Sequence, residues 1–368
     1  MRRGDPCTQY QEKMRTEFAL DEVRHALERL AANACLELPA KQPHWGDAIL
    51  CDGLTYAAQT LCIATPIEAA ERWFAPKLAA GPRTTGWFWF WAAEALPALD
   101  LYLKTNDSRY LEYAHIIIEF MEKSAARTSD GAFVPHPPAL EVWIDVCYFT
   151  APALALLGRI LGDLAMLGRA ADQMILHRDY LADSATGLFW HVAYVDRKSH
   201  SPCWWARGNS WFSIAAPQVM AEIEAAGQPQ ALAAKVEKIR EALALQLNRV
   251  VSMQDASGLW HTVIDRDDSY LEASSAAGFA LALGRAIRTR LPGLDAVRAH
   301  NAYSRALGAI CSKIDSHGAF TDVSQQTPPG DFAFYNSIEV GTAPFATGVC
   351  MMALSEAIEA RTWQTKKL

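Results

Sequence analysis

Hydrophobic residues recur every three or four positions along most of this chain, which is the period of an amphipathic α-helix. Segment 229–249 is a clear example, because charged residues fall between its apolar ones. The apolar residues of that segment are Leu232, Val236, Ile239, Leu243 and Leu247. The pattern predicts a helix with one buried face and one solvated face.

Read in the same way, the whole chain predicts about twelve helices of roughly 12 to 22 residues. They lie at 19–36, 47–63, 67–79, 89–104, 107–126, 142–161, 164–180, 208–226, 229–249, 270–290, 295–313 and 340–361. We find no convincing strand alternation, and no Ser/Gly-rich or strongly charged linker divides the chain. We therefore predict a single domain over residues 1–368, in which residues 1–18 form a flexible N-terminal extension.

A short turn sequence with a central glycine recurs between the predicted helices. Its glycines are Gly131, Gly187, Gly258 and Gly318, and their spacings of 56, 71 and 60 residues each accommodate two helices. Repeated helical hairpins bury every apolar face when they close into a ring. We therefore predict an all-α fold, an (α/α)6 barrel or six-hairpin toroid, with its ligand site among the long loops at one end. An open superhelix is the weaker alternative, since helical solenoid repeats mostly run from about 33 to 47 residues.

Composition and charge narrow the range of partners. Hydrophobic residues make up 51% of the chain, and the formal net charge is −7. This acidic balance gives no electrostatic reason to expect nucleic acid or an anionic membrane as a partner. The eight cysteines include no C-x-x-C pair, the N-terminus lacks the apolar stretch of a signal peptide, and segment 87–103 is broken by acidic residues. We expect a soluble cytoplasmic protein that acts on a small molecule.

Asp145 is the strongest candidate for acid–base chemistry. It opens an otherwise apolar helix and has Trp143, Ile144 and Val146 as close neighbours. Burial among such side chains disfavours the charged carboxylate and favours the protonated acid that a general acid must be. The alternative is that Asp145 only caps the start of the helix, where aspartate is favoured for structural reasons.

A second dense segment, 201–212, contains Arg207, Gly208 and Trp211. The planar guanidinium fork of arginine suits a carboxylate, and glycine lets the backbone approach a ligand closely. Arg207 could instead join two loops by pairing with an internal acid. The tryptophans of this segment offer flat apolar faces that suit sugar rings, although packing in the core is the commoner role.

Motifs for metal and nucleotide chemistry are missing from the sequence. His136, His177, His191 and His261 are spread over separate loops and one helix end, with no H-x-x-x-H or Cys/His cluster. The chain has no G-x-G-x-x-G, Walker A or G-x-S-x-G sequence. We therefore expect no metal site, and we expect the histidines to make hydrogen bonds, either within the protein or to a polar ligand.

Five stretches follow one another in a familiar order: VWIDVCYFTAPALALLGRILGD, ADQMILHRDYLADSATGLFWHVAY, SPCWWARGNSWF, QDASGLWHTVIDRDDSYLEASSAAGFA and VGTAPFATGVCMMALSEA. Together they resemble glycoside hydrolase family 105 and its relative family 88, the unsaturated rhamnogalacturonyl and unsaturated glucuronyl hydrolases. The resemblance covers residues from about 130 to 361, with weaker similarity back to His44 and Trp45.

This resemblance implies an (α/α)6 barrel that removes a Δ4,5-unsaturated uronic acid from oligosaccharides left by polysaccharide lyases, such as those of pectin. Asp145 then protonates C4 of the enol ether, water adds at C5, and the hemiketal opens. No cofactor is implied, and a homo-oligomer is left open. The substrate-binding residues that the resemblance implies are His44, Trp45, His136, Trp143, His191, Arg207, Asn209 and Trp211.

One departure from the family pattern concerns the fourth predicted helix. Many relatives carry a second aspartate or an asparagine near its start, where this chain has Glu94 as the nearest acid. Loss of that group puts substrate choice, and activity itself, in question. Two rival functions are therefore kept: a sugar epimerase or isomerase on the same barrel, and an inactive oligosaccharide-binding relative.

Overall fold

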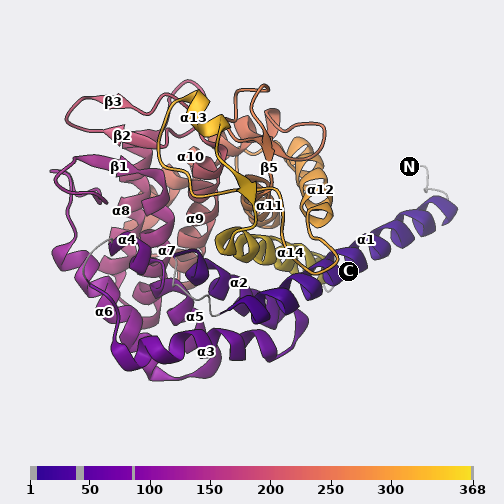
Figure 1. Cartoon of the computed structure of the whole chain (residues 1–368), viewed down its shortest axis with the longest axis horizontal. Helices are drawn as coiled ribbons and strands as arrows, with labels where there is room; N and C mark the ends of the chain where they lie inside the picture. The colour runs from indigo at the N-terminus through magenta and orange to yellow at the C-terminus, as the bar shows by residue number, and fades with distance from the viewer. Residues whose placement is uncertain (1–5, 39–44, 85–87, 366–368) are drawn as a thin grey trace.

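The structure is a computed structural model that describes residues 6–38, 45–84 and 88–365. Figure 1 shows long helices arranged around a common axis, with short strands and loops gathered at one end of the barrel. The first and last long helices contact each other, so the ring closes on itself.

Six helices form the inner ring and touch one another in chain order. They are α2 (Trp45–Leu61), α5 (Ala95–Thr105), α7 (Ile144–Leu161), α9 (Ala206–Ala225), α11 (Ala273–Arg288) and α14 (Pro344–Thr365). The last of them, α14, packs against the first, α2. This closure confirms the predicted (α/α)6 barrel and excludes the open superhelix.

Six further helices cover the ring from outside, each packed against inner helices. They are α1 (Pro6–Glu37), α3 (Thr65–Ala80), α6 (Ser108–Ser124), α8 (Leu164–Leu181), α10 (Ala233–Ser252) and α12 (Ala296–Ser312). Two short helices, α4 (Phe88–Ala92) and α13 (Phe332–Asn336), and the 3-10 turn Gln230–Leu232 complete the helical elements of the described residues.

Small and apolar residues let the inner helices pack closely on all sides. Helix α7 is long and apolar enough to cross a membrane by composition, but 78% of its 18-residue window is buried within the barrel, as expected of a core helix. Where α2 crosses α14, a Cβ placed on Gly53 would lie 2.5 Å from the carbonyl oxygen of Gly348. The two backbones therefore touch, which only glycine permits here.

The recurring turn sequence has one backbone conformation at each of its four positions. Gly131, Gly187, Gly258 and Gly318 have φ values of 103°, 74°, 89° and 84°, in the region that favours glycine. Each turn follows an outer helix and leads the chain back toward an inner one. The repeat read from the sequence is thus a repeated structural unit.

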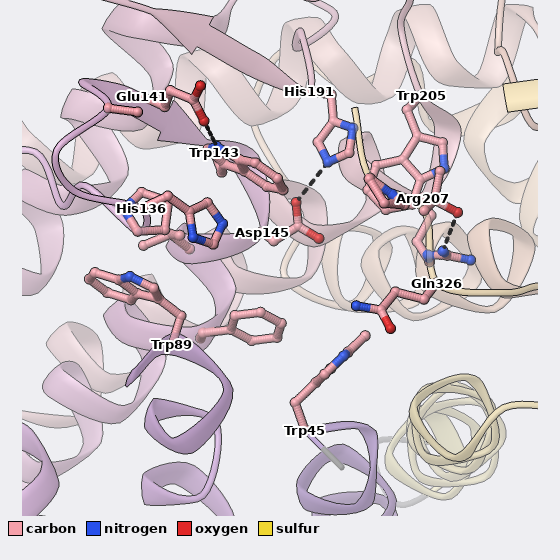
Figure 2. A pocket seen from close by; sticks show the side chains of 16 residues that line it. Trp45, Trp89, His136, Glu141, Trp143, Asp145, His191, Trp205, Arg207 and Gln326 are labelled. Carbon is pink, nitrogen blue, oxygen red and sulfur yellow. Dashed lines mark hydrogen bonds and ion pairs between the residues drawn. The ribbon is translucent and has the colours of Figure 1, made fainter. Parts of the chain in front are cut away.

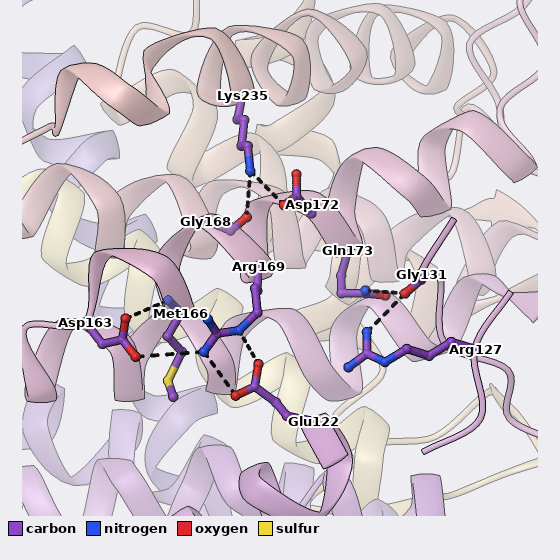
Figure 3. Close-up of polar contacts among 10 residues, drawn as sticks. All are labelled: Glu122, Arg127, Gly131, Asp163, Met166, Gly168, Arg169, Asp172, Gln173 and Lys235. Carbon is purple, nitrogen blue, oxygen red and sulfur yellow. Dashed lines mark hydrogen bonds and ion pairs between the residues drawn. The ribbon is translucent and has the colours of Figure 1, made fainter. Parts of the chain in front are cut away.

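Polar side chains on the outer helices connect neighbouring hairpins (Figure 3). Arg169 of α8 forms an ion pair with Glu122 of α6, and Lys235 of α10 lies 2.7 Å from the carboxylate of Asp172 on α8. Gln173 and Arg127 both donate to the carbonyl oxygen of Gly131, at 2.9 and 3.0 Å. These contacts fix the first of the four turns against α8.

The structure also contains short strands that the sequence pattern did not predict. Strands β1 (Glu141–Trp143), β5 (Leu271–Glu272) and β7 (Val340–Gly341) occupy the starts of three predicted helices, so α7, α11 and α14 begin later than expected. They pair with β2 (Val192–Tyr194), β4 (Trp260–His261) and β6 (Val323–Ser324), and β3 (Ser199–His200) pairs with β2. Strands of two or three residues are too short to show alternation.

Two further helix boundaries differ from the prediction. Helix α1 begins at Pro6, so residues 6–18, which we expected to form a flexible extension, are helical. The helix predicted at 89–104 is divided, because a turn at Ala93 and Glu94 separates α4 from α5. Trp89 of α4 lines the same cavity as Glu141 and Trp143 of β1.

Candidate active site

A cavity of about 420 Å³ opens at the end of the barrel that holds the short strands. This volume lies in the range of small-molecule sites. Its walls come from the loop before α7 and the first turns of α7, the loop before β2, the start of α9, the segment after β6, and aromatic residues of α2 and α4 (Figure 2). The lining residues are Trp45, Trp89, Pro135, His136, Ala139, Glu141, Trp143, Asp145, Val146, Phe149, His191, Trp205, Arg207, Gln326, Thr327 and Pro328.

Asp145 lies in the first turn of α7 and faces this cavity. Its side chain is 18% exposed, and Oδ2 lies 3.4 Å from Nε2 of His191. Among the described residues, Oδ2 has no hydrogen-bond partner. The N-cap of the helix is Trp143, whose side chain makes no capping bond. Asp145 is therefore not the N-cap, although it is the acidic residue of the first turn that the structural alternative also allows.

The local backbone joins Asp145 to His191. Strand β1 pairs with β2, and the amide of Ile144 donates to the carbonyl oxygen of His191 at 3.0 Å. The imidazole ring is buried and lies against Trp205, with ring centroids 4.3 Å apart. The two side chains are thus held in register by the pairing of β1 with β2.

The other imidazole nitrogen of His191 is bonded to a residue far along the chain. Its Nδ1 lies 2.7 Å from the hydroxyl of Tyr335, which is fully buried in α13. Burial raises the pKa of the Tyr335 phenol well above its ordinary range, so the phenol keeps its proton. Tyr335, His191 and Asp145 therefore form one chain of polar groups that ends at the cavity.

Arg207 also lines the cavity, but most of its donors are used by the protein. Its Nη1 donates to Ser274 Oγ (3.2 Å) and to the carbonyl of Ser324 (2.6 Å). Its Nη2 donates to the carbonyl of Gln325 (2.7 Å) and to Thr327 Oγ1 (2.9 Å). Only the Nε–H has no partner among the described residues. These bonds agree with the alternative role considered for Arg207, in which it joins two loops. Its partners, however, are carbonyl and hydroxyl oxygens and not an internal acid.

The guanidinium of Arg207 is buried between two aromatic rings. Its central carbon lies 4.6 Å from the Trp205 ring centroid and 4.7 Å from that of Phe345. Burial lowers the pKa of Arg207, and the nearby carboxylate of Glu272 opposes this effect. Because arginine starts from a pKa above 12, the group stays positive at neutral pH.

Aromatic rings make up much of the remaining wall. Trp45 stacks on Phe345 with centroids 4.9 Å apart, and Trp143 meets the ring of His136 edge-on at 4.6 Å. The indole N–H of Trp143 donates to Glu141 at 2.8 Å. Partial burial lowers the pKa of His136, so this ring is mainly neutral at pH 7. Apolar faces with a few polar groups between them are typical of sugar-binding sites.

Three lining side chains have a buried polar atom with no hydrogen-bond partner among the described residues: Asp145 Oδ2, Trp205 Nε1 and Arg207 Nε. A buried polar group without a partner costs about 1–3 kcal/mol. In this structure these atoms are covered by their neighbours, so they are not themselves open to a ligand. The positive charge of Arg207 at the wall favours a polar, partly anionic molecule.

Two residues that the resemblance placed at the substrate lie behind the cavity wall. The side chain of Asn209 is buried and bonded to the backbone of Phe189 and Trp205, at 2.8 to 3.0 Å. Trp211 is 1% exposed and stacks on Tyr148 at 4.9 Å. Neither is among the lining residues, whereas Trp45, His136, Trp143, His191 and Arg207 are. His44 lies outside the described residues.

Glu94, the residue considered as a second acid, is engaged elsewhere. Its carboxylate lies 2.5 Å from Lys77 Nζ and accepts from the hydroxyl of Tyr113. It is not among the lining residues. The second carboxylate that does line the cavity is Glu141, which precedes Trp143 by two residues.

Sequence reasoning missed the segment from β6 to α13. Gln326, Thr327 and Pro328 line the cavity, and Tyr335 holds His191. This segment has no helical period and no motif that we recognised, so only its position before the last inner helix could have drawn attention to it. No cluster of three or more His, Cys, Asp or Glu side chains suited to a metal ion occurs in the part of the chain that the structure describes.

Comparison with known proteins places the chain among carbohydrate-active enzymes. A family model described as Glycosyl Hydrolase Family 88 matches residues 21–361. The chain is similar to the unsaturated rhamnogalacturonyl hydrolase YesR of Bacillus subtilis (strain 168), with 29% identity over 237 residues. That match covers 62% of this chain and 64% of YesR, which is less than two thirds of the relative's length.

Solved structures share the fold over almost the whole chain. One is the crystal structure of a possible member of the GH105 family from Salmonella enterica subsp. enterica serovar Paratyphi A, with a TM-score of 0.82 and 25% identity. It covers 92% of this chain and 95% of that one. Another is the unsaturated glucuronyl hydrolase from Bacillus sp. GL1, with a TM-score of 0.67, 14% identity, and coverage of 91% and 96%. At 14% identity, the similarity to this second structure shows only that the two proteins share a fold.

Proposed function

Because this chain belongs to Glycosyl Hydrolase Family 88, as its sequence motifs predicted, we propose that it removes a Δ4,5-unsaturated uronic acid, galacturonyl or glucuronyl, from the non-reducing end of oligosaccharides. The substrates would be fragments that polysaccharide lyases release from pectin or a related acidic polysaccharide. We further propose that residues 1–368 form one catalytic domain that works in the cytoplasm without nucleic acid or membrane partners.

The observation that supports this function is the position of Asp145. Its carboxyl group faces the cavity, Oδ2 has no hydrogen-bond partner among the described residues, and His191 lies 3.4 Å away. An acid at such a position can transfer its proton to a substrate atom and take one back from water. Hydration of an enol ether requires one such group and not the pair of carboxylates used in ordinary glycoside hydrolysis.

In the proposed reaction, Asp145 gives its proton to C4 and the C4=C5 double bond opens toward an oxocarbenium ion at C5. Water attacks C5 and returns a proton to the Asp145 carboxylate. The resulting hemiketal opens to a ketone, and the hemiacetal left at C1 expels the next sugar. One water molecule is consumed overall, and the acid is regenerated.

The cavity offers groups for binding the sugar that this reaction needs. Trp45, Trp143 and Trp205 present rings to the apolar face of the sugar. His136 would bond a hydroxyl group of the sugar, His191 would support Asp145 from within the wall, and the Arg207 charge would favour an anionic substrate. Asn209 and Trp211 contribute from behind the wall, by holding Phe189, Trp205 and Tyr148 in place.

The test follows the ultraviolet absorbance of the unsaturated uronate, which disappears as the double bond is hydrated. Purified protein is assayed with a panel of unsaturated disaccharides from pectin, rhamnogalacturonan and glycosaminoglycan lyases. The Asp145→Asn variant, which keeps the shape but cannot donate the acid proton, should lose about 10²- to 10⁴-fold in kcat. The proposal is contradicted if none of the disaccharides loses its ultraviolet absorbance, or if Asp145→Asn is fully active. Isomerisation of free sugars would favour the epimerase alternative.

A further inference from the structure

The segment 323–328 forms one wall of the cavity and is held there by Arg207. Four of the five guanidinium N–H groups are donated to the protein, three of them to this segment. A bidentate bond to a carboxylate needs two adjacent N–H groups of the fork. The Nε–H alone has no protein partner among the described residues, so Arg207 cannot make that bond while it holds the segment.

Two consecutive glutamines in this segment point in different directions. The Gln325 amide donates to the carbonyls of Val323 (3.2 Å) and Thr342 (3.1 Å), so it bonds to its own backbone surroundings. The Gln326 side chain lines the cavity, and Figure 2 shows it between Arg207 and Trp45. Within the described residues, no hydrogen bond to the Gln326 amide is found.

Local sequence holds Gln326 at this place. Thr327 is buried and bonded to both Arg207 and the Gln325 carbonyl, at 2.9 and 2.7 Å. Pro328 follows, and a residue before proline is restricted to extended conformations. The backbone on either side of Gln326 is therefore fixed, while its side chain remains free to meet a ligand.

We propose that Gln326 is a specificity-determining residue that bonds sugar hydroxyl groups, and that Arg207 is the positioning residue that presents it. This inference rests on the proposed function. A carboxamide can donate and accept at the same time, which matches a pair of neighbouring hydroxyls, each of which does both. A substrate carboxylate can only accept hydrogen bonds, so it would use the NH2 group of the carboxamide but not its carbonyl oxygen.

A glutamine outside the cavity, Gln230, provides a matched control. Gln326→Ala removes one or two hydrogen bonds to the substrate, so we expect KM for the preferred unsaturated disaccharide to rise by about threefold to tenfold per bond while kcat stays the same. Gln230→Ala removes the same chemical group from an exposed side chain that does not line the cavity, and its KM should equal that of the wild type. Equal KM values for the two variants, or a loss confined to kcat, overturn the role of Gln326.

A double-mutant cycle tests the role of Arg207. Arg207→Lys keeps the positive charge but cannot make four bonds, so the segment loses its fixed position and KM should rise. If Arg207 acts through Gln326, the double variant Arg207→Lys/Gln326→Ala should bind little worse than Arg207→Lys alone. Additive KM effects would show that Arg207 contacts the substrate independently, and the positioning role would then be wrong.

Failure of this inference and failure of the proposed function give different results. Wild-type protein that leaves every unsaturated disaccharide intact contradicts the proposed function before any variant is made. Wild-type turnover with unchanged KM in Gln326→Ala contradicts this inference alone. Thermal unfolding of each variant, compared with the wild type, shows whether a loss of activity reflects a loss of folding.

Discussion

Removing one hydroxyl group from Tyr335 should slow catalysis without changing any residue that lines the cavity. Tyr335→Phe keeps the aromatic ring, which is fully buried, and deletes only the partner of His191 Nδ1 at 2.7 Å. The imidazole is itself 1% exposed, so water cannot readily replace the lost bond. A buried nitrogen without a partner costs about 1–3 kcal/mol.

The position of His191 beside the proposed acid means that loss of this hydrogen bond should affect catalysis as well as stability. Its Nε2 lies 3.4 Å from Asp145 Oδ2, so a ring that turns to find another partner changes the surroundings of the proposed acid. Only the part of this cost that is greater in the transition state than in the enzyme–substrate complex lowers kcat, so with about 1.4 kcal/mol per tenfold change in rate the fall is at most roughly 5- to 150-fold. KM should change little, because Tyr335 does not line the cavity.

The assay compares kcat and KM of Tyr335→Phe with those of the wild type on an unsaturated disaccharide. Tyr102→Phe serves as the control, because Tyr102 lies on α5, does not line the cavity and has no hydrogen bond at its hydroxyl within the described residues. Its kinetics should be those of the wild type. A Tyr335→Phe enzyme with wild-type kcat would refute the idea that the Tyr335–His191 bond supports the acid.

Two predictions concern stability. Gly53→Ala places a Cβ 2.5 Å from the Gly348 carbonyl, so its unfolding free energy in urea should fall by about 1–3 kcal/mol. Gly308→Ala is the control, because no atom lies within 4 Å of its Cβ, and it should stabilise helix α12 by about 0.5–1 kcal/mol. Burial lowers the pKa of His177 to about 4, so the stability that its neutral form contributes is complete above pH 6.5 and is lost as the pH falls toward 4. This shift in pKa corresponds to about 3 kcal/mol of unfolding free energy. In His177→Gln the unfolding free energy should therefore fall less between pH 7 and 4.5 than it does in the wild type. Equal falls in the two proteins would contradict this role of His177.

The ring of helices was predictable because outer helices such as α6, α10 and α12 carry an apolar period, while inner helices such as α7 are apolar runs too long for a strand. The four turn glycines were equally readable, since φ values of 74° to 103° require a residue type that the sequence displays openly. The strands β1, β5 and β7 were not predictable, because two or three residues cannot show a period and their flanks continue the helical pattern. The starts of three inner helices were therefore placed too early.

The residues of the candidate site were likewise predictable only in part. Asp145 and His191 lie in motifs that can be recognised locally, and the structure brings both to one cavity. Trp211 and Asn209 belong to an equally recognisable motif, yet a helix presents only some of its residues to one side, and these two face into the packed interior. A motif thus identifies the helix that approaches the ligand but does not tell which of its side chains reach it.

Gln326 and Tyr335 illustrate a different limit. Their segment has no period of its own, and its course is fixed by contacts to residues more than a hundred positions away, Arg207 to Ser324 and His191 to Tyr335. Such contacts exist only when these distant parts of the chain have packed together. The proposed acid therefore depends on the last part of the barrel to be assembled in chain order, although the acid itself lies in the middle of the chain. Variants that weaken the closure between α2 and α14 should for this reason reduce activity at temperatures below those that unfold the helices.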